Sequence, residues 1–185
     1  MPKSRKFWII VDCLLLATCL LACVAVLVET GLGPIGYEVL SAEFVVGVGH
    51  QAPEFEVMAL SGESIRLSQF RGRPVLLSFS ASWCPACNVE APILQAVHQR
   101  HPDLPVLLVD LEEDAATARA FATKYGMTFL VALDTDGEVS HDYRVYAIPS
   151  VFLIDGAGVI RNRFPDEFTV ERVDEALGAL AVGED

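Results

Sequence analysis

From residue 51 onward, the hydrophobic positions of the chain recur with the period of strands in some segments and of helices in others. Short runs rich in Val, Leu and Phe predict buried strands at 74–80, 105–110 and 128–134. Paired runs around turn residues predict hairpins at 53–67 and 150–164. Apolar stripes at helical spacing predict helices at 85–100, 115–125 and 168–181. Strands that alternate with helices in this way predict an α/β sandwich with a mixed central sheet.

The N-terminal part of the chain has a different pattern. Residues 7–28 are apolar apart from Asp12, and a helix over them would be about 33 Å long, enough to cross a hydrocarbon core of about 30 Å. Basic residues within 1–6 favour a cytoplasmic start, with the rest of the chain outside. The expected protein is single-pass in the cell membrane. Its parts are a basic tail at 1–6, an anchor at 7–28, a linker at 29–50 and an extracytoplasmic domain at 51–185.

Two other interpretations of the apolar segment stay open at this point. A cleaved signal peptide normally has a shorter apolar stretch of about 7–15 residues, followed by a site of small residues. Lipid attachment at Cys23 would also tether the domain, although the apolar run continues past that residue as "VAVLV". The membrane anchor fits the length of the run best.

Composition limits the possible partners. The formal net charge is −12, and a protein that binds nucleic acid through phosphates needs a basic face. The sequence therefore predicts no nucleic-acid partner. It also contains no flavin or nicotinamide motif, and we expect no cofactor.

The cysteines carry the candidate chemistry. Three of the five lie in the apolar segment, which leaves Cys84 and Cys87 for the predicted domain. A bridge between them would close a very short loop and would stabilise the fold little. Cys84 falls after the strand at 74–80 and starts the helix at 85–100, where free amide groups and a partial positive charge favour a thiolate. In such a position the pKa of a cysteine can fall to about 3.5–7.5.

This placement predicts a redox pair in which each sulfur has its own task. Cys84 attacks a disulfide, and Cys87, one helical turn on, resolves the mixed disulfide. A structural zinc site would need about four ligands, and beyond the two cysteines the chain offers the pair His98 and His101 at the far end of the same helix. We therefore expect no metal site.

Three separated motifs add a resemblance to a known family. The segments "LSQFRGRPVLLSFSASWCPACNVEAP" and "YRVYAIPSVFLIDGAGVI", behind a membrane segment and "APEFEV", resemble the TlpA/ResA branch of membrane-tethered, thioredoxin-like proteins of the redoxin type. The resemblance spans about residues 49–180. It implies a three-layer thioredoxin-like sandwich with an N-terminal hairpin extension, and thiol–disulfide exchange outside the membrane.

The resemblance also implies roles for particular residues. Glu90 matches a carboxylate that assists proton movement at the cysteines. Pro149 matches a cis-proline that faces the cysteine pair, and the backbone of Ile148 before it would pair with substrate. Trp83 and Pro85 would frame the surface on which substrate docks.

Some positions depart from the family pattern. Ser78 lies where many cytosolic thioredoxins carry a buried acid, which favours Glu90 as the titrating partner. Ser80 replaces a large aromatic residue and could widen the groove. Asn88 stands where relatives often have a basic residue, and this removes a charge that would favour the thiolate.

The predicted function is reduction of protein disulfides outside the membrane, with apocytochrome c as one possible substrate and a membrane thiol transporter as electron donor. An alternative is a copper chaperone that binds the metal through the two cysteines and a histidine. A third interpretation is an accessory protein dedicated to one disulfide-rich enzyme.

Overall fold

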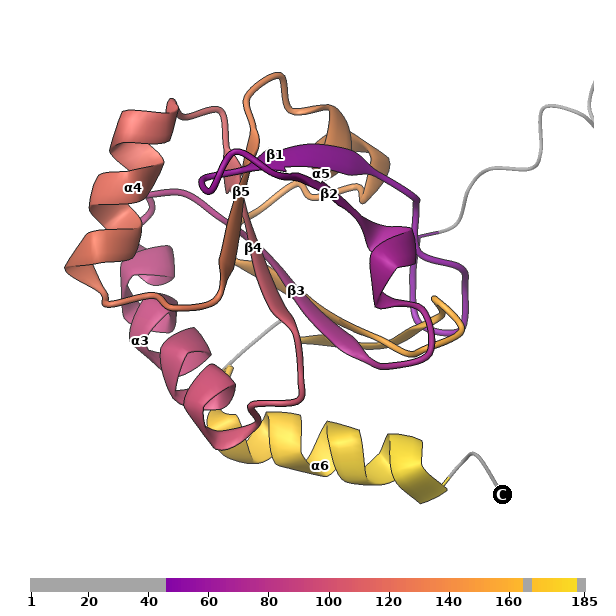
Figure 1. Ribbon diagram of the computed structural model, residues 1–185. Helices are drawn as coiled ribbons and strands as arrows, with labels where there is room; N and C mark the ends of the chain where they lie inside the picture. The colour runs from indigo at the N-terminus through magenta and orange to yellow at the C-terminus, as the bar shows by residue number, and fades with distance from the viewer. Residues whose placement is uncertain (1–45, 165–167, 183–185) are drawn as a thin grey trace, which may run out of the picture. The chain divides into compact units, whose positions relative to one another are not determined.

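The computed structural model describes residues 46–164 and 168–182, which belong to one compact unit of the chain (Figure 1). The strands are β1 (Glu56–Ala59), β2 (Ser64–Arg66), β3 (Val75–Ser80), β4 (Val106–Leu111), β5 (Leu130–Asp134), β6 (Ser150–Ile154) and β7 (Ile160–Phe164). The helices are η1 (Leu67–Phe70, a 3₁₀ turn), α3 (Pro85–Arg100), α4 (Ala115–Lys124), α5 (Glu138–Asp142) and α6 (Val170–Val182).

The seven strands of the described residues form one mixed sheet in the order β2-β1-β5-β4-β3-β6-β7. The strands β3, β4 and β5 run parallel, whereas β6 pairs antiparallel with β3 and the hairpins β1–β2 and β6–β7 lie at the two edges. Parallel neighbours need a crossover connection, and α3 and α4 provide it between β3, β4 and β5. The predicted mixed sheet is therefore confirmed, with the first hairpin as an extension at one edge.

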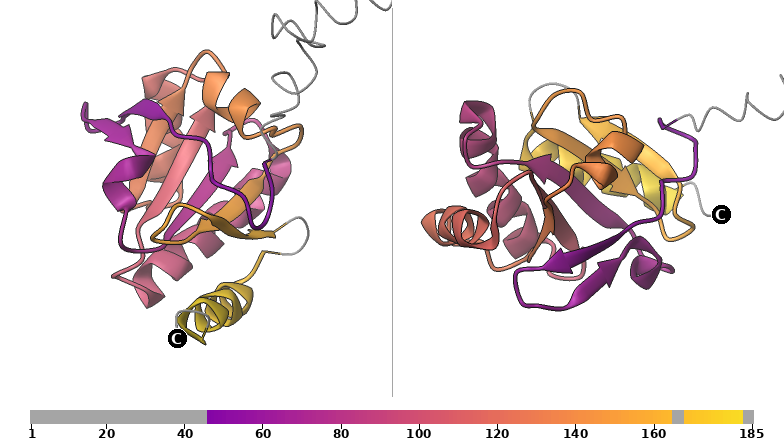
Figure 2. Two further views of the ribbon diagram at one scale, coloured as in Figure 1. Left: turned by 90° about the vertical axis from the view of Figure 1, so that its right-hand side faces the viewer. Right: turned by 90° about the horizontal axis from the view of Figure 1, so that it is seen from above.

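The two faces of the sheet are covered by different layers (Figure 2). One cluster joins the sheet to three helices through Leu94 of α3, Phe121 of α4 and Val173 of α6. The opposite cluster holds η1, the N-terminal segment and the region of α5, through residues that include Phe70, Val139 and Tyr143. Since β3 and β6 have buried residues at each position, their side chains fill both clusters, as continuous apolar runs predict.

Two short helices were not predicted from the sequence. The segment 67–70 forms η1, and the predicted turn at 135–138 leads directly into α5. Both oxygens of the buried Asp134 accept hydrogen bonds at the start of α5, from the amides of Val139 (3.1 Å) and Ser140 (2.8 Å). A helix of five residues has too few turns for a periodic signal, and the carboxylate that binds its first amides lies in the preceding strand.

The domain begins earlier than predicted. The amide of Gly49 donates to the carbonyl of Ile160 (2.8 Å), and the amide of Ile160 donates to the carbonyl of His50 (2.9 Å). Residues 46–50 therefore belong to the folded unit rather than to the predicted linker. The predicted anchor at 7–28 lies outside the described residues; within them, no helix has the length and apolarity needed to cross a membrane.

One carboxyl group is enclosed in the packed face of β4. Asp110 is fully buried, and neither of its oxygens has a hydrogen-bond partner within the described parts of the chain. Burial, followed by the nearby negative charge of Glu113, raises the pKa of Asp110 to about 8. The folded protein therefore holds this proton at neutral pH.

This retained proton predicts a pH-dependent stability. The unfolded chain releases the Asp110 proton near pH 4, so between about pH 4 and 8 the folded state binds more protons and its free energy of unfolding falls as the pH rises. We expect Asp110→Asn to lack this contribution to the slope. The unfolding free energy of the variant minus that of the native protein should therefore rise by on the order of 2–5 kcal/mol between pH 4 and pH 8.

Urea unfolding of the two proteins across this pH range measures the effect. The exposed Asp103 offers a matched control, because the same exchange there removes a carboxyl group without changing a buried site. Equal slopes for the native protein and Asp110→Asn would show that the buried carboxyl does not hold its proton.

Candidate active site

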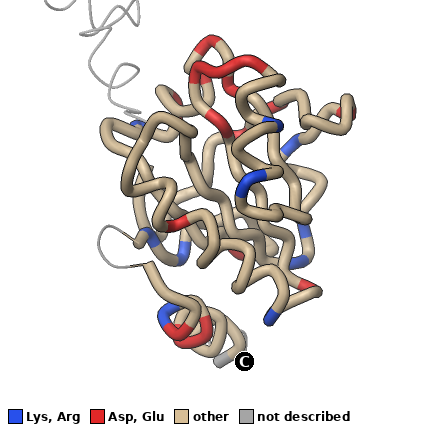
Figure 3. Tube along the Cα trace, turned by 90° about the vertical axis from the view of Figure 1, so that its left-hand side faces the viewer, with Lys and Arg blue, Asp and Glu red and all other residues tan. Residues whose placement is uncertain are grey.

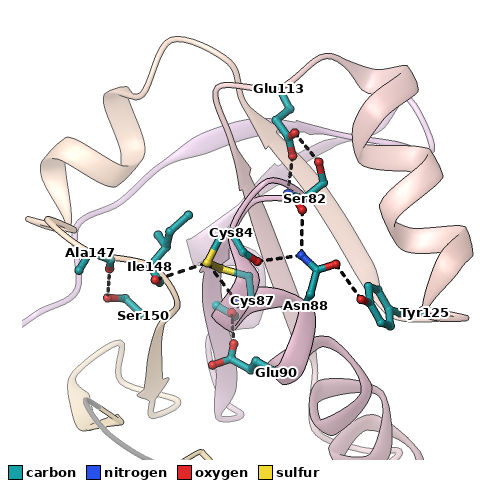
Figure 4. Close-up of a disulfide and its surroundings, with 11 residues drawn as sticks. Ser82, Cys84, Cys87, Asn88, Glu90, Glu113, Tyr125, Ala147, Ile148 and Ser150 are labelled. Atoms are coloured by element: carbon teal, nitrogen blue, oxygen red, sulfur yellow. Dashed lines mark hydrogen bonds between the residues drawn. A yellow bond between two sulfur atoms is a disulfide. The ribbon is translucent and has the colours of Figure 1, made fainter.

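The sulfur of Cys84 lies at the first turn of α3 (Figure 4). Cys84 is the N-cap residue, and its Sγ accepts the amide hydrogen of Cys87 at 3.1 Å. The two cysteines form a disulfide across 5.2 Å between their Cα atoms. Cys84 is 4% exposed and Cys87 is fully buried, so a partner can reach the first sulfur more easily than the second.

The local sequence explains why the helix starts here. Strand β3 ends at Ser80, and Pro85 occupies the first helical position, where its fixed φ suits the helix and its missing amide hydrogen leaves no donor unpaired. The amide of Cys87 has no carbonyl partner inside the helix and donates to the Cys84 sulfur. Because the start of a helix carries partial positive charge, the site suits an anionic sulfur when the disulfide is reduced.

The segment before β6 closes the other side of the sulfur. The Ile148–Pro149 peptide bond is cis, as the resemblance implies, and the carbonyl oxygen of Ile148 lies 3.6 Å from the Sγ of Cys84. The sheet dictates this approach, because Ser150 pairs with Phe79 and the residue before Ser150 must therefore face the chain that follows Phe79. Residues far apart in the sequence thus meet at the end of β3.

Glu90 lies one turn beyond Cys87 on the buried side of α3. Its carboxyl group is buried and accepts a hydrogen bond from the hydroxyl of Ser78 in β3 at 3.0 Å. Burial raises the pKa of Glu90 to about 7, against a smaller lowering effect of the Ser78 hydrogen bond. A carboxyl group with this pKa can both release and accept a proton at neutral pH.

Glu113 is a residue of the site that the sequence did not reveal. It follows β4, which runs parallel to β3, so both strands lead to the same edge of the sheet. Its carboxylate accepts the amide hydrogen of Ser82 at 2.7 Å and the hydroxyl hydrogen of Ser82 at 2.6 Å. Glu113 thereby fixes the loop before Cys84. Its position in the acidic stretch at 112–114 was the available signal, and Figure 3 shows acidic residues gathered at this end of the domain.

Exposed apolar side chains come from each segment that borders the sulfur. Trp83 is 63% exposed, Val89 on α3 is 69% exposed, and Tyr146 before the cis-proline is 84% exposed. Pro85 is also exposed, whereas Ile148 is half-buried. Large exposed hydrophobic side chains are typical of surfaces that bind other proteins, and Val89 and Tyr146 add to Trp83 and Pro85 as exposed residues that could contact a substrate.

The two candidate histidine ligands lie apart from the cysteines. The Nε2 of His101 lies 2.6 Å from a carboxylate oxygen of Asp174 in α6, and the ring of His98 packs edge-on against Phe129. Within the described residues, no group of three or more His, Cys, Asp or Glu side chains is arranged to hold a metal ion. The histidine of the copper-chaperone hypothesis is therefore not found beside the cysteines of this part of the chain.

Comparison with known proteins agrees with this geometry. Residues 48–163 match the AhpC/TSA family. The chain is 30% identical to the thiol–disulfide oxidoreductase ResA of Bacillus thuringiensis, over 78% of this chain and 87% of that protein. It is 34% identical to the thioredoxin-like protein YneN of Bacillus subtilis, over 70% of this chain and 78% of that protein.

A solved structure extends the likeness to the fold. The domain superposes with a TM-score of 0.62 on a secreted disulfide oxidoreductase of Mycobacterium tuberculosis that is homologous to DsbE of E. coli. The two are 25% identical, and the match covers 68% of this chain and 95% of that one. The mixed sheet with its three helices on one face is thus a thioredoxin-like fold. The chain belongs to the AhpC/TSA family and is a ResA-like thiol–disulfide oxidoreductase.

Proposed function

We propose that this oxidoreductase is anchored in the cell membrane and reduces disulfides of proteins outside it. The observation that carries the proposal is the position of the Cys84 sulfur, between the Cys87 amide at 3.1 Å and the Ile148 carbonyl at 3.6 Å. The first group stabilises a thiolate. The second belongs to a backbone segment that can pair with an extended substrate, as edge strands do.

The reaction begins with the dithiol form of the enzyme. The Cys84 thiolate attacks one sulfur of the substrate disulfide, which breaks the substrate S–S bond and forms a mixed disulfide with the enzyme. The second substrate sulfur leaves as a thiolate and takes up a proton. Trp83, Val89 and Tyr146 provide the apolar surface on which the substrate lies during this step.

Resolution of the mixed disulfide needs a second thiolate. Cys87 is buried, so its thiol must lose a proton in surroundings that disfavour charge. We assign this proton to the carboxylate of Glu90. The Cys87 thiolate then attacks Cys84 Sγ, forms the Cys84–Cys87 disulfide and releases the substrate as a dithiol, so two electrons pass from enzyme to substrate.

The place of action and the electron supply are inferred from the sequence. The apolar run at 7–28 has the length of a membrane span, with basic residues before it. A related structure is that of a secreted protein. Regeneration requires a dithiol donor, for which we propose a membrane thiol transporter. Apocytochrome c, in cytochrome c maturation, is our proposed substrate.

The different roles of the two cysteines predict different defects when each is replaced by serine. Cys84→Ser should abolish reduction of the insulin disulfides, because no nucleophile remains. Cys87→Ser should keep the first attack and accumulate a mixed disulfide, because no thiol resolves it. Insulin turbidity and non-reducing gel electrophoresis with mass spectrometry measure the two outcomes.

The cysteines outside the domain provide the control for this experiment. Cys19→Ser removes a thiol from the apolar segment and should reduce insulin at the native rate. Full activity of Cys84→Ser, or a mixed disulfide formed through Cys87 in that variant, would contradict the assigned roles.

The proton-transfer role predicts a pH effect of Glu90. Glu90→Gln keeps a hydrogen-bonding group for Ser78 but cannot exchange a proton. We expect the resolving step at pH 7 to slow by about tenfold or more, and the inflection near pH 7 to disappear from its rate profile. Stopped-flow fluorescence of substrate reduction measures both.

Glu63→Gln, in the exposed turn between β1 and β2, is the matched control and should leave the profile unchanged. A native profile for Glu90→Gln would assign the proton to another group.

A further inference from the structure

Asn88 uses the whole hydrogen-bonding capacity of its side chain beside the nucleophile (Figure 4). Its Nδ2 group donates to the carbonyl oxygens of Ser82 and Cys84, each at 2.8 Å. Its Oδ1 atom accepts from the hydroxyl of Tyr125 at 2.7 Å and from the amino group of Lys124 at 2.9 Å. The side chain therefore joins the loop that carries the cysteine to the end of α4.

The two carbonyls held by Asn88 belong to the segment that positions the reactive sulfur. The other polar groups of Ser82, its amide and its hydroxyl, bind Glu113. The Cys84 carbonyl also accepts the backbone amide of Asn88 at 3.1 Å, so one residue binds it twice. The backbone on both sides of Trp83 is thus fixed, although the Trp83 side chain itself is exposed.

Tyr125 and Lys124, which bind Asn88 at the end of α4, also contact each other or neighbouring rings. The ring of Tyr125 packs edge-on against the buried Phe121, with 5.3 Å between ring centres, which fixes the direction of its hydroxyl group. The Lys124 amino group lies 4.8 Å from the centre of the same ring. An amino group of α4 therefore lies beside Asn88, at the position where relatives often carry a basic residue of their own.

We propose that Asn88 is a positioning residue for thiol–disulfide exchange, which holds the main chain of Ser82 and Cys84 so that the Cys84 sulfur stays over the Cys87 amide. The inference rests on the proposed role of Cys84 as nucleophile. It assigns to Asn88 no contact with substrate. The partner residues Tyr125 and Lys124 act by holding the Asn88 amide in one orientation.

Loss of the Asn88 hydrogen bonds should lower both the thiolate fraction of Cys84 and the reduction potential. When the Cys84 backbone is free to move, the sulfur loses part of the hydrogen bond that stabilises its anion. Less thiolate forms at neutral pH, and the reduced state becomes less favourable relative to the disulfide. The reduction potential therefore falls, and the reactivity of the thiol at neutral pH falls with it.

The experiment uses the reduced full-length protein and iodoacetamide as probe. We expect Asn88→Ala to slow alkylation of Cys84 at pH 7 by about fivefold, the equivalent of about one net hydrogen bond. The midpoint of the alkylation rate should move to higher pH, and the reduction potential against glutathione should become more negative. Tyr125→Phe, which keeps the ring and loses one donor to Asn88, should shift all three in the same direction by less.

Two further variants separate positioning from other effects. Gln95→Ala is the matched control, because Gln95 is also an amide on α3 and exchanges two hydrogen bonds of 3.0 Å with Thr128, away from the cysteines. It should cost stability in urea without changing alkylation of Cys84. Lys124→Met removes the charge but leaves both carbonyl contacts of Asn88, and its effect should be smaller than that of Asn88→Ala.

The outcomes distinguish this inference from the proposed function. If Cys84 of the native protein were not the reactive thiol, the proposed function would fail. Native reactivity and potential in Asn88→Ala and Tyr125→Phe, with a reactive Cys84 in the native protein, would overturn the role of Asn88 alone. If Lys124→Met reproduced the whole effect of Asn88→Ala, charge and not the hold on the main chain would be responsible, and the inference would be rejected.

Discussion

The active site depends on one contact, the hydrogen bond from the Cys87 amide to the Cys84 sulfur. This bond exists because α3 begins at Cys84, and α3 begins there because β3 ends a few residues earlier and Pro85 starts the helical turn. The amide would be an unpaired donor in any helix. Here it donates to the Cys84 sulfur, which carries negative charge as a thiolate. One hydrogen bond therefore both satisfies the backbone amide and stabilises the reactive sulfur.

Asp110 in β4 and Glu90 in α3 are both buried carboxyl groups. Asp110 carries a side chain without a hydrogen-bond partner among the described residues, whereas Glu90 has the hydroxyl of Ser78. Burial raises the pKa of both, to about 8 and about 7. Keeping such groups neutral costs less than burying their charge, so the fold tolerates them at neutral pH. They differ in position: Glu90 lies on α3, which carries the cysteines, whereas Asp110 lies in β4, the strand beside β3.

The sequence was sufficient for features that depend on neighbours along the chain. The run at 74–80 and the cysteine after it predicted both β3 and the first turn of α3, and the resemblance identified the cis bond before Pro149. Features made by distant segments were missed. Asn88 was interpreted only as the loss of a charge, because the sequence does not show that Lys124 reaches it from α4. The acidic stretch that contains Glu113 did not show which loop Glu113 binds, because the parallel pairing of β3 and β4 brings the two together.

The buried acid beside the cysteines, Glu90, lies on a helix and not on the neighbouring strand. Ser78 occupies the strand position at which many cytosolic thioredoxins carry an acid, and here its hydroxyl binds the carboxyl of Glu90 instead. The acid therefore belongs to α3, which also carries Cys84 and Cys87. An acid on the strand would change its distance to the sulfurs whenever the helix shifted against the sheet. An acid on the helix keeps its place relative to both cysteines, and this supports the proton transfer that we propose for Glu90.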